Sequence, residues 1–181
     1  MVKRSLGFVL LAAVLAGSGC AALSSDPNTR TPGSVLDDQI IEGMVKREIW
    51  KADPDFNDAN LVVVSFNGVL LLTGQVASEA LRLKAEEISK GLEKVSRVHN
   101  ELEIGVPTSM VARANDGWLT TKVKAKMAAD AEVMARKLKV VTENGVVYLM
   151  GIVTREEADR AVELAASVFG VQKIVKVFEY V

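Results

Sequence analysis

Cysteine and histidine are almost absent from this 181-residue chain, since each occurs only once, as Cys20 and His99. His99 has no second histidine and no cysteine with which to share a metal ion, so a satisfied or solvated histidine on a strand is the better interpretation. The chain also lacks the motifs of serine hydrolases, phosphate-binding loops and dinucleotide-binding folds. We therefore expect no enzyme activity, no cofactor and no metal site.

An excess of positive charge is also missing. The 22 basic and 23 acidic residues give a net charge of −1, so the chain as a whole is not drawn to nucleic acid or to anionic surfaces. Apolar residues make up 49% and charged residues 25%, which is typical of a folded protein and excludes wholesale disorder. The length suits one ordinary domain or two small ones. Attraction to an anionic partner must therefore come from a local patch.

Residues 1–19 have the pattern of a secretory signal peptide. Lys3 and Arg4 form a short basic region, residues 6–15 form an apolar run, and small residues occupy positions 16–19. The apolar run is too short to span a bilayer. Removal of this segment takes away Lys3 and Arg4 and leaves 20 basic and 23 acidic residues, a net charge of −3.

The segment that ends at Cys20 resembles the lipobox of bacterial lipoproteins, in which this cysteine becomes the acylated first residue of the mature chain. Ser18 and Gly19 fit that motif, whereas Gly17 stands where a leucine is usual. The alternative is an ordinary secreted protein with one free cysteine. Ala21 stands where inner-membrane lipoproteins commonly carry aspartate, so the resemblance implies a lipid anchor in the outer membrane, facing the periplasm.

The rest of the chain is an internal repeat, in which the same pattern occurs twice at a constant offset. Asn67-Gly68 recurs as Asn144-Gly145, and Gly74 recurs as Gly151. The segments around them, SFNGVLLLTGQV and TENGVVYLMGIV, match along their length. The helical and strand patterns on either side recur in the same order, so chance does not explain the match.

Each repeat is predicted to fold as αββαβ. First helices are expected at 37–50 and 116–131, second helices at 78–94 and 154–169, and closing strands at 95–104 and 171–181. Asn-Gly joins two β-rich runs, and both of its residues tolerate the positive φ of a type I′ turn. Gly74 and Gly151 indicate a bulge or a close backbone approach. Thr154 and Glu157 form a capping box, and Phe169 is expected to complete a buried stripe.

We therefore expect an α+β protein with two tandem αββαβ domains, each a three-stranded sheet covered by two helices. The expected boundaries are a signal peptide at 1–19, a lipidated and flexible N-terminal tether at 20–35, a first domain at 36–105, a linker at 106–114 and a second domain at 115–181.

The first helix of the second repeat carries the most distinctive surface. At about 100° per residue, Leu119, Val123 and Met127 form a stripe that is predicted to face the core, and Trp118 lies well over 90° from it, beside lysines and alanines. An indole next to ammonium groups suits an interfacial membrane contact. The helical wheel places Leu119 toward the core, but it is kept in the set. The candidate lipid-binding residues are Trp118, Leu119, Lys122, Lys124, Ala125, Lys126 and Ala129.

Trp118 has an alternative interpretation, in which it packs on the neighbouring repeat and the lysines only solvate the helix. In the first repeat, Ile40, Met44 and Glu48 occupy the places of Trp118, Lys122 and Lys126. A helix that serves only the fold would have similar flanks in both copies. We therefore hypothesise that Ile40 and Met44 dock on the second repeat, which keeps its own flank for lipid.

Two acidic residues, Asp116 and Asp130, border the lysine segment. They are expected to weaken its positive field, and Asp116, near the helix start, also suits the helix dipole.

The repeats resemble the BON domain. The resemblance is carried by the second strands at 72–76 (LTGQV) and 149–153 (LMGIV), by Gly170-Val171 before the closing strand, and most specifically by the segments at 118–123 (WLTTKV) and 142–145 (TENG). Two such units behind a lipobox resemble the dual BON-domain outer-membrane lipoproteins, and this resemblance covers the whole chain.

That resemblance implies a non-enzymatic phospholipid-binding lipoprotein. In this family the second BON domain binds anionic phospholipids, chiefly phosphatidylglycerol and cardiolipin, through its first helix, with a tryptophan at the position of Trp118. The resemblance also implies support of outer-membrane integrity, enrichment at division sites and a link to the outer-membrane protein assembly machinery. The alternative is a periplasmic adaptor that docks on this machinery. A cell-wall-binding or chaperone-like protein would need an extended groove, which the sequence does not indicate.

Overall fold

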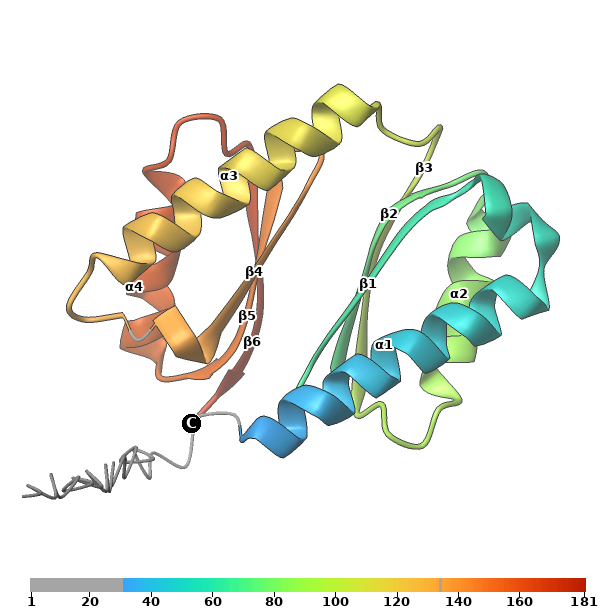
Figure 1. The fold of residues 1–181 in the computed structure, drawn as a ribbon, viewed down its shortest axis with the longest axis horizontal. Helices are drawn as coiled ribbons and strands as arrows, with labels where there is room; N and C mark the ends of the chain where they lie inside the picture. The colour runs from blue at the N-terminus through green and yellow to red at the C-terminus, as the bar shows by residue number, and fades with distance from the viewer. Residues whose placement is uncertain (1–30, 134) are drawn as a thin grey trace, which may run out of the picture.

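The computed structural model describes residues 31–133 and 135–181, so the predicted signal peptide, Cys20 and most of the predicted tether lie outside the described residues. Two αββαβ units follow one another, as expected (Figure 1). The first unit consists of α1 (Pro32–Ala52), η1 (Pro54–Asp58), β1 (Asn60–Phe66), β2 (Val69–Val76), α2 (Glu79–Lys90) and β3 (Arg97–Ile104). The second consists of α3 (Met110–Ala128), η2 (Ala135–Lys137), β4 (Leu138–Glu143), β5 (Val146–Val153), α4 (Arg155–Ala166) and β6 (Lys173–Tyr180).

Each unit contains a three-stranded mixed sheet in which the second strand is central, in the orders β1-β2-β3 and β4-β5-β6. The first two strands of each sheet are antiparallel, and the third is parallel to the central one. The hairpin residues Asn67, Gly68, Asn144 and Gly145 all have positive φ, which confirms the predicted turns. A Cβ at position 74 would lie 1.9 Å from the carbonyl oxygen of Asn60, so Gly74 marks a close backbone approach.

Both first helices begin earlier than the sequence analysis expected. α1 begins at Pro32, and the hydroxyl of its N-cap, Thr31, accepts a hydrogen bond from the amide of Ser34 at 3.1 Å. Residues 32–35 are therefore helical and not part of a flexible tether. α3 begins at Met110 with Ser109 as its N-cap, so residues 110–114 of the predicted linker are helical as well. The physical reason is that each hydroxyl satisfies an otherwise free amide at the helix start.

Both second helices end earlier than expected, at Lys90 and Ala166. The capping box of α4 is present with both of its hydrogen bonds. Phe169 does not complete a buried stripe, because it lies beyond the helix and is 91% exposed. The helix tightens at its end, since the amide of Val168 donates to the carbonyl of Ala165, three residues back, and the turn that follows carries Phe169 away from the helical stripe.

Both faces of each sheet are apolar. Along β2, Leu70 and Leu72 join the core beneath α1 and α2, whereas Val69 and Leu71 join a cluster on the opposite face, as the two-residue period of a strand requires. The second unit has its own core beneath α3 and α4. Each sheet therefore has a second apolar face that its own helices do not cover.

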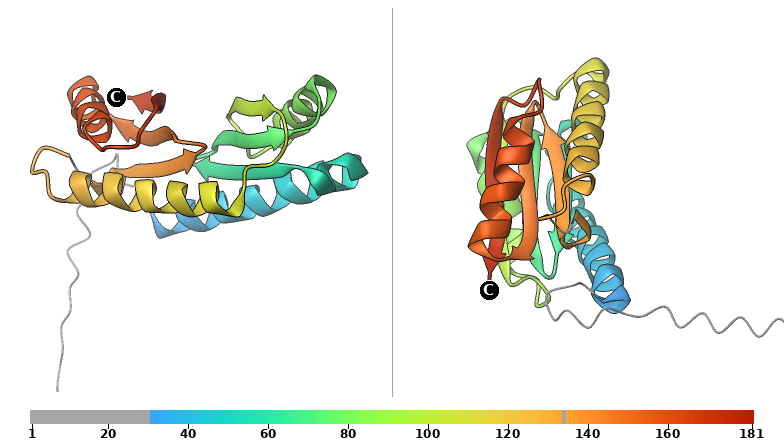
Figure 2. Two further views of the ribbon diagram at one scale, coloured as in Figure 1. Left: turned by 90° about the horizontal axis from the view of Figure 1, so that it is seen from above. Right: turned by 90° about the vertical axis from the view of Figure 1, so that its left-hand side faces the viewer.

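The two sheets pack back to back through these second faces, with the helices on the outside (Figures 1 and 2). The predicted docking of the repeats through Ile40 and Met44 is wrong, since neither belongs to the shared cluster and Ile40 is 44% exposed. A sheet face buries more apolar area than two side chains on a helix flank, and it therefore dominates the contact. The shared cluster consists of Val64, Phe66, Val69, Leu71, Tyr148, Met150 and Val177.

Polar bonds at the edge of this interface also join the units. One carboxylate oxygen of Glu143, a buried residue at the end of β4, accepts hydrogen bonds from Asn60 Nδ2 at 2.8 Å, Gln75 Nε2 at 3.1 Å and Thr108 Oγ1 at 3.3 Å. Lys139 Nζ donates to Glu42 Oε1 on α1 at 2.9 Å. These bonds help to fix the register of one sheet on the other, because they join β4 of the second unit to α1, β1 and β2 of the first.

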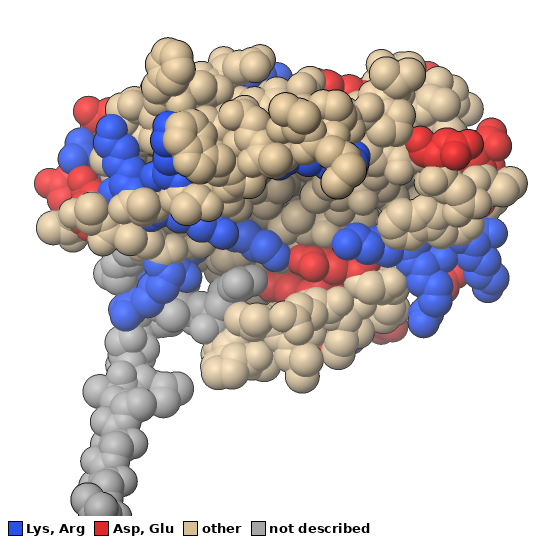
Figure 3. Space-filling model, turned by 45° about the horizontal axis from the view of Figure 1, so that its top comes forward, with Lys and Arg blue, Asp and Glu red and all other residues tan. Residues whose placement is uncertain are grey.

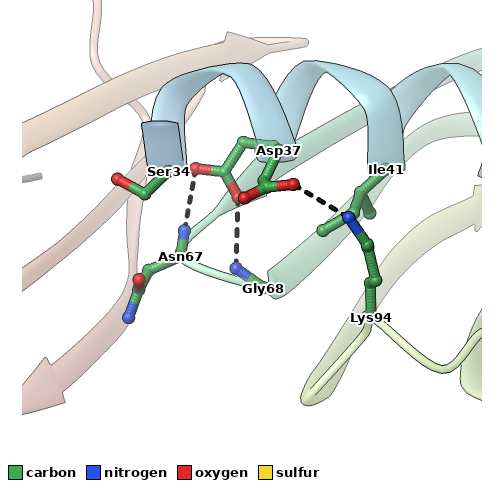
Figure 4. Close-up of a pocket in the computed structure, with 7 residues that line it drawn as sticks. Ser34, Asp37, Ile41, Asn67, Gly68 and Lys94 are labelled. Atoms are coloured by element: carbon green, nitrogen blue, oxygen red, sulfur yellow. Dashed lines mark hydrogen bonds and ion pairs between the residues drawn. The ribbon is translucent and has the colours of Figure 1, made fainter. Parts of the chain in front are cut away.

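A buried aspartate ties each first helix to the hairpin turn of its own unit. In the second unit, Asp116 accepts hydrogen bonds from the amides of Asn144 at 2.8 Å and Gly145 at 2.9 Å. In the first unit, Asp38 accepts from the amides of Asn67 and Gly68 (Figure 4). The two aspartates occupy equivalent places in the two copies, so the repeat is also present at the level of individual hydrogen bonds.

We predict that Glu143→Ala lowers the free energy of unfolding by about 2–4 kcal/mol, because three donors lose their shared acceptor inside the interface. Urea denaturation followed by circular dichroism measures the change. The control is Glu87→Ala, which removes an exposed carboxylate from α2 and should alter stability by less than about 0.5 kcal/mol. Equal effects of the two substitutions would contradict a role for Glu143 in joining the units.

We predict that Asp116→Ala destabilises the protein by about 2–4 kcal/mol, because it leaves two turn amides without an acceptor. The adjacent exposed residue provides the control, since Asn115→Ala leaves the turn bonds in place. Amide hydrogen exchange locates the effect: the amides of Asn144 and Gly145 should lose protection first. If protection at this turn is unchanged, the carboxylate does not hold it.

Candidate functional site

The exposed flank of α3 is set by the way the helix packs on its own sheet. Leu119, Val123 and Met127 are all buried in the core of the second unit, which confirms the predicted stripe. On the side toward β4, Thr120 Oγ1 donates to Thr142 Oγ1 at 2.7 Å. Trp118 is therefore turned outward, and its side chain is 55% exposed. The indole contributes little to the fold, which leaves it available for a contact outside the chain.

Lys122 lies directly against Trp118. Its ammonium nitrogen is 3.2 Å from the centre of the indole ring, and the two residues are one helical turn apart. A cation over the ring face is attracted by the ring quadrupole, by about 0.5–1 kcal/mol at an exposed site. The pair presents an aromatic surface and a positive charge at the same point of the helix.

The other predicted residues divide into exposed and buried members. Lys124, Ala125 and Lys126 are exposed on α3, and Ala129 is exposed at its C-cap. Leu119 is 1% exposed and lies in the core, so it is not part of the surface that Trp118 presents. The reason is its place at the edge of the buried stripe, where it touches the turn before β6. The side chain of Leu119 thus anchors α3 in the core of the second unit.

The two acidic residues that border the lysines are both held by other parts of the second unit, and their weakening of the positive field stays a prediction. Asp116 is buried and its carboxylate is used by the hairpin turn. Asp130 accepts hydrogen bonds from Arg160, with Oδ2 at 2.7 Å from one guanidinium nitrogen, and this bond holds the pKa of the Asp130 carboxyl below its ordinary value. Arg160 also pairs with Glu132 and Glu163, so its single positive charge is shared among three carboxylates.

The equivalent flank of α1 has a different chemistry. Ile40 takes the place of Trp118, and Met44 takes that of Lys122. Glu48 takes the place of Lys126 and forms ion pairs with Arg47 and Lys51. The buried stripes of the two helices correspond residue by residue, so the difference is confined to the surface.

The exposed flank of α3 is longer than the sequence analysis indicated. Val111 precedes Trp118 by nearly two helical turns and therefore lies on the same side of the helix. It is 80% exposed. Sequence reasoning missed it by assigning residues 106–114 to a linker, although Ser109 is a recognisable N-cap signal. In Figure 3, lysine and arginine side chains lie among uncharged ones on the left of the view, where the second unit lies, with acidic side chains at that edge and further basic ones on the right.

The described residues offer little support for a small-molecule or metal site. A hollow of about 300 Å³ at the start of α1 is lined by Asp37, Asp38, Lys94 and the Asn67-Gly68 turn (Figure 4). Its charged groups pair with one another, since Lys94 Nζ lies 2.8 Å from Asp37 Oδ1 and Asp38 holds the turn. His99 lies partly buried on β3, and burial lowers its pKa.

Among residues 31–133 and 135–181, histidine, cysteine and acidic side chains do not gather into a group that would hold a metal ion. Within the same ranges, every helix is too short or too polar to cross a bilayer. The flank of α3 therefore remains the principal candidate site of the described chain.

Comparison with known proteins identifies both units. The BON domain family matches residues 37–106 and 115–181. The chain is 39% identical over 171 residues to the outer membrane lipoprotein DolP of Haemophilus influenzae, covering 94% of this chain and 88% of that protein. It is 36% identical to a 21 kDa hemolysin of Actinobacillus pleuropneumoniae (84% and 78% covered). It is also 31% identical to the osmotically-inducible protein Y of Escherichia coli (95% and 92% covered).

We predict that the two tryptophans differ in accessibility. Trp50 is partly buried and its indole N–H donates to the carbonyl of Phe56 at 3.0 Å, whereas Trp118 is exposed. Acrylamide should therefore quench the fluorescence of a Trp50→Phe variant, which reports Trp118, more strongly than that of a Trp118→Phe variant. Equal quenching of both variants would mean that Trp118 is packed against the protein in solution.

Proposed function

The chain belongs to the BON-domain family, as a DolP-like outer-membrane lipoprotein, and from this premise we propose that its second domain binds anionic phospholipids through α3. The family is one without known catalytic activity. We further propose that Cys20 carries the lipid anchor, that the folded part faces the periplasm, and that the flank of α3 reads the lipid composition of the membrane to which the chain is attached.

One observation carries this proposal: an exposed tryptophan lies under a lysine on a helix flank where the sister repeat has isoleucine and methionine. Indole rings favour the boundary between headgroups and acyl chains, because the ring is apolar and the N–H can be hydrogen-bonded there. Lys122, Lys124 and Lys126 supply ammonium groups for lipid phosphates. Val111, Ala125 and Ala129 on the same flank are small or apolar and permit close approach to the membrane.

The expected interaction is weak for each residue and additive over the flank. A lysine near an anionic membrane surface contributes about 1 kcal/mol, so three lysines and one indole do not hold a free protein at high dilution. A lipid anchor changes this, because tethering raises the effective concentration of the site at the membrane. The flank then selects lipids within one membrane and does not determine which membrane is occupied.

Phosphatidylglycerol and cardiolipin are the proposed ligands, since both present phosphate without a compensating positive charge. Binding of such lipids would link the protein to outer-membrane integrity and, where cardiolipin is enriched by curvature, to the division site. These roles depend on the lipid contact and would be lost with it.

A second candidate function is supported by the exposed flank of α1. Leu36 and Ile40, one turn apart, are 60% and 44% exposed, and the back-to-back packing of the sheets leaves them uncovered. Such a flank suits a protein partner, and the outer-membrane protein assembly machinery is the candidate for an adaptor in this location. This function predicts a complex that persists after lipid is removed by detergent.

We predict that the mature chain from residue 20, with Cys20→Ser and Trp50→Phe, shows a blue shift of Trp118 fluorescence with vesicles that contain phosphatidylglycerol or cardiolipin. Purely zwitterionic vesicles should have no such effect. Salt should reduce the response, because it screens the lysines. Replacement of Lys122, Lys124 and Lys126 by glutamine should weaken binding about a hundredfold in total, at about 1 kcal/mol each.

Trp118→Glu should abolish vesicle binding while leaving the thermal unfolding midpoint nearly unchanged, since the side chain is exposed. Ile40→Glu is the matched control at the equivalent position of α1 and should leave lipid binding intact. If Trp118→Glu retains binding or unfolds the protein, Trp118 has a packing role and the adaptor function takes first place. Loss of a copurifying assembly partner in Ile40→Glu alone would support that second function.

A further inference from the structure

We propose that the membrane contact of the second domain has a second aromatic insertion point, Phe169, in the turn between α4 and β6. This inference rests on the proposed lipid-binding function, because it assigns another residue to the same surface. The proposed binding partner is an anionic phospholipid bilayer. Trp118 and Phe169 enter it together from two different elements of the fold.

Phe169 is held out of the protein by a turn that is itself well fixed. Its neighbours Val168 and Val171 pack in the core of the second unit. The amide of Val171 donates to the carbonyl of Val168 at 3.2 Å, and the amide of Gln172 donates to Gly145 at 2.9 Å. Phe169 is nevertheless 91% exposed, the largest exposed fraction among the large apolar residues of the described chain. A phenyl ring displayed on an ordered turn leaves apolar area in water, which an apolar ligand would cover.

The turn borders the flank of α3 that carries Trp118. A Cβ at position 170 would lie 2.9 Å from Leu119 Cδ2, so the backbone of Gly170 lies against Leu119. Leu119 stands between Trp118 and Thr120 on the helix, about 100° from each. Because Thr120 faces β4 through Thr142, the Trp118 side of Leu119 is the side turned away from β4. Figure 1 shows the turn between α4 and β6 beside the middle of α3.

The first repeat provides an internal comparison for this position as well. Its corresponding turn has the same backbone bonds, from Val95 to the carbonyl of Leu92 and from Ser96 to Gly68. Glu93 therefore takes the place of Phe169, and the turn contains charged residues where the second repeat has phenylalanine and glycine. The second repeat thus has aromatic residues, Trp118 and Phe169, at two exposed positions where the first repeat has Ile40 and Glu93.

Two insertion points fix the orientation of the domain on the membrane, whereas a single insertion point does not. A single indole permits the domain to rotate about the contact, whereas a helix flank and a separate turn fix a plane. The charge of this surface favours an anionic bilayer over an apolar protein groove, because Lys122 and Lys126 lie on the same side of α3 as Trp118. Phenylalanine lacks a polar atom and would sit deeper than the indole.

The chain has one cysteine, so a fluorophore can be placed at a chosen residue in a Cys20→Ser background. The mature chain from residue 20 is labelled with an environment-sensitive dye at F169C and, as the matched control, at E93C. Each is mixed with phosphatidylcholine vesicles with and without phosphatidylglycerol, and quenchers at known depths in the acyl chains locate the dye. We expect the dye at 169, but not the dye at 93, to enter the acyl region, and only when phosphatidylglycerol is present.

The outcomes separate this inference from the function on which it rests. Trp118 is read in the same vesicles from an unlabelled Trp50→Phe chain. If Trp118 responds and the dye at 169 stays hydrated, the second insertion point is wrong and lipid binding through α3 stands. If neither responds, the proposed function fails together with the inference. If the dyes at 169 and 93 enter equally, adsorption is unspecific and the inference is overturned.

A substitution series without dye provides the second test. Phe169→Ser should weaken binding to phosphatidylglycerol vesicles roughly tenfold, as expected for partial burial of a phenyl ring, and Phe169→Leu should restore most of it. Glu93→Ser is the control and should leave the affinity unchanged. Thermal unfolding midpoints should agree within the series, because the Phe169 side chain is exposed. Unchanged affinity in Phe169→Ser would overturn the inference.

Discussion

Burial of the second apolar face of each sheet is the contact on which the rest of this structure depends. Two helices cover only one side of a three-stranded sheet, and the central strands are apolar on both sides. The sheets therefore meet back to back, and Tyr148, Met150 and Leu71 occupy their common interior. One consequence is that the apolar contact between the units uses neither first helix, although Glu42 on α1 bonds Lys139 of the second unit. The outer flanks of α1 and α3 are free to carry different chemistry, and Figure 2 shows that both helices lie on the same side of the molecule.

The α3 flank presents lysines and an indole, while the two acids that border it are engaged elsewhere in the second unit. Along the sequence, the negative charges of Asp116 and Asp130 lie next to the positive charges of three lysines. In the structure the first carboxylate is engaged by the hairpin turn and the second by Arg160. The flank therefore presents ammonium groups and an indole to the outside, although the chain as a whole is slightly acidic. Local geometry decides the field here, and net charge does not.

The sequence predicted correctly those features that depend on residues close together in the chain. The Asn-Gly turns, the Thr154 capping box and the buried stripe of α3 each depend on residues within a few positions of one another, and the exposure of Trp118 followed from that stripe. The features that the sequence did not predict depend on residues that lie far apart in the chain. Apolar runs in β2 and β5 indicate two buried faces but do not name what covers the second. The role of Asp116 depends on a hairpin turn much further along the chain. Phe169 was misplaced because α4 ends at Ala166, before the predicted stripe reaches it.

The paired aspartates have a consequence for how such a protein changes over generations. Each repeat holds its first helix by a buried carboxylate and a buried stripe, and both devices are complete without the residues at positions 40 and 118. After a duplication, these outward positions can therefore drift or be selected in one copy while the scaffold of both is preserved. Tandem repetition thus keeps the residues needed for folding in both copies, while the outward residues are free to change. Two copies of one fold can therefore take different functions within a single polypeptide.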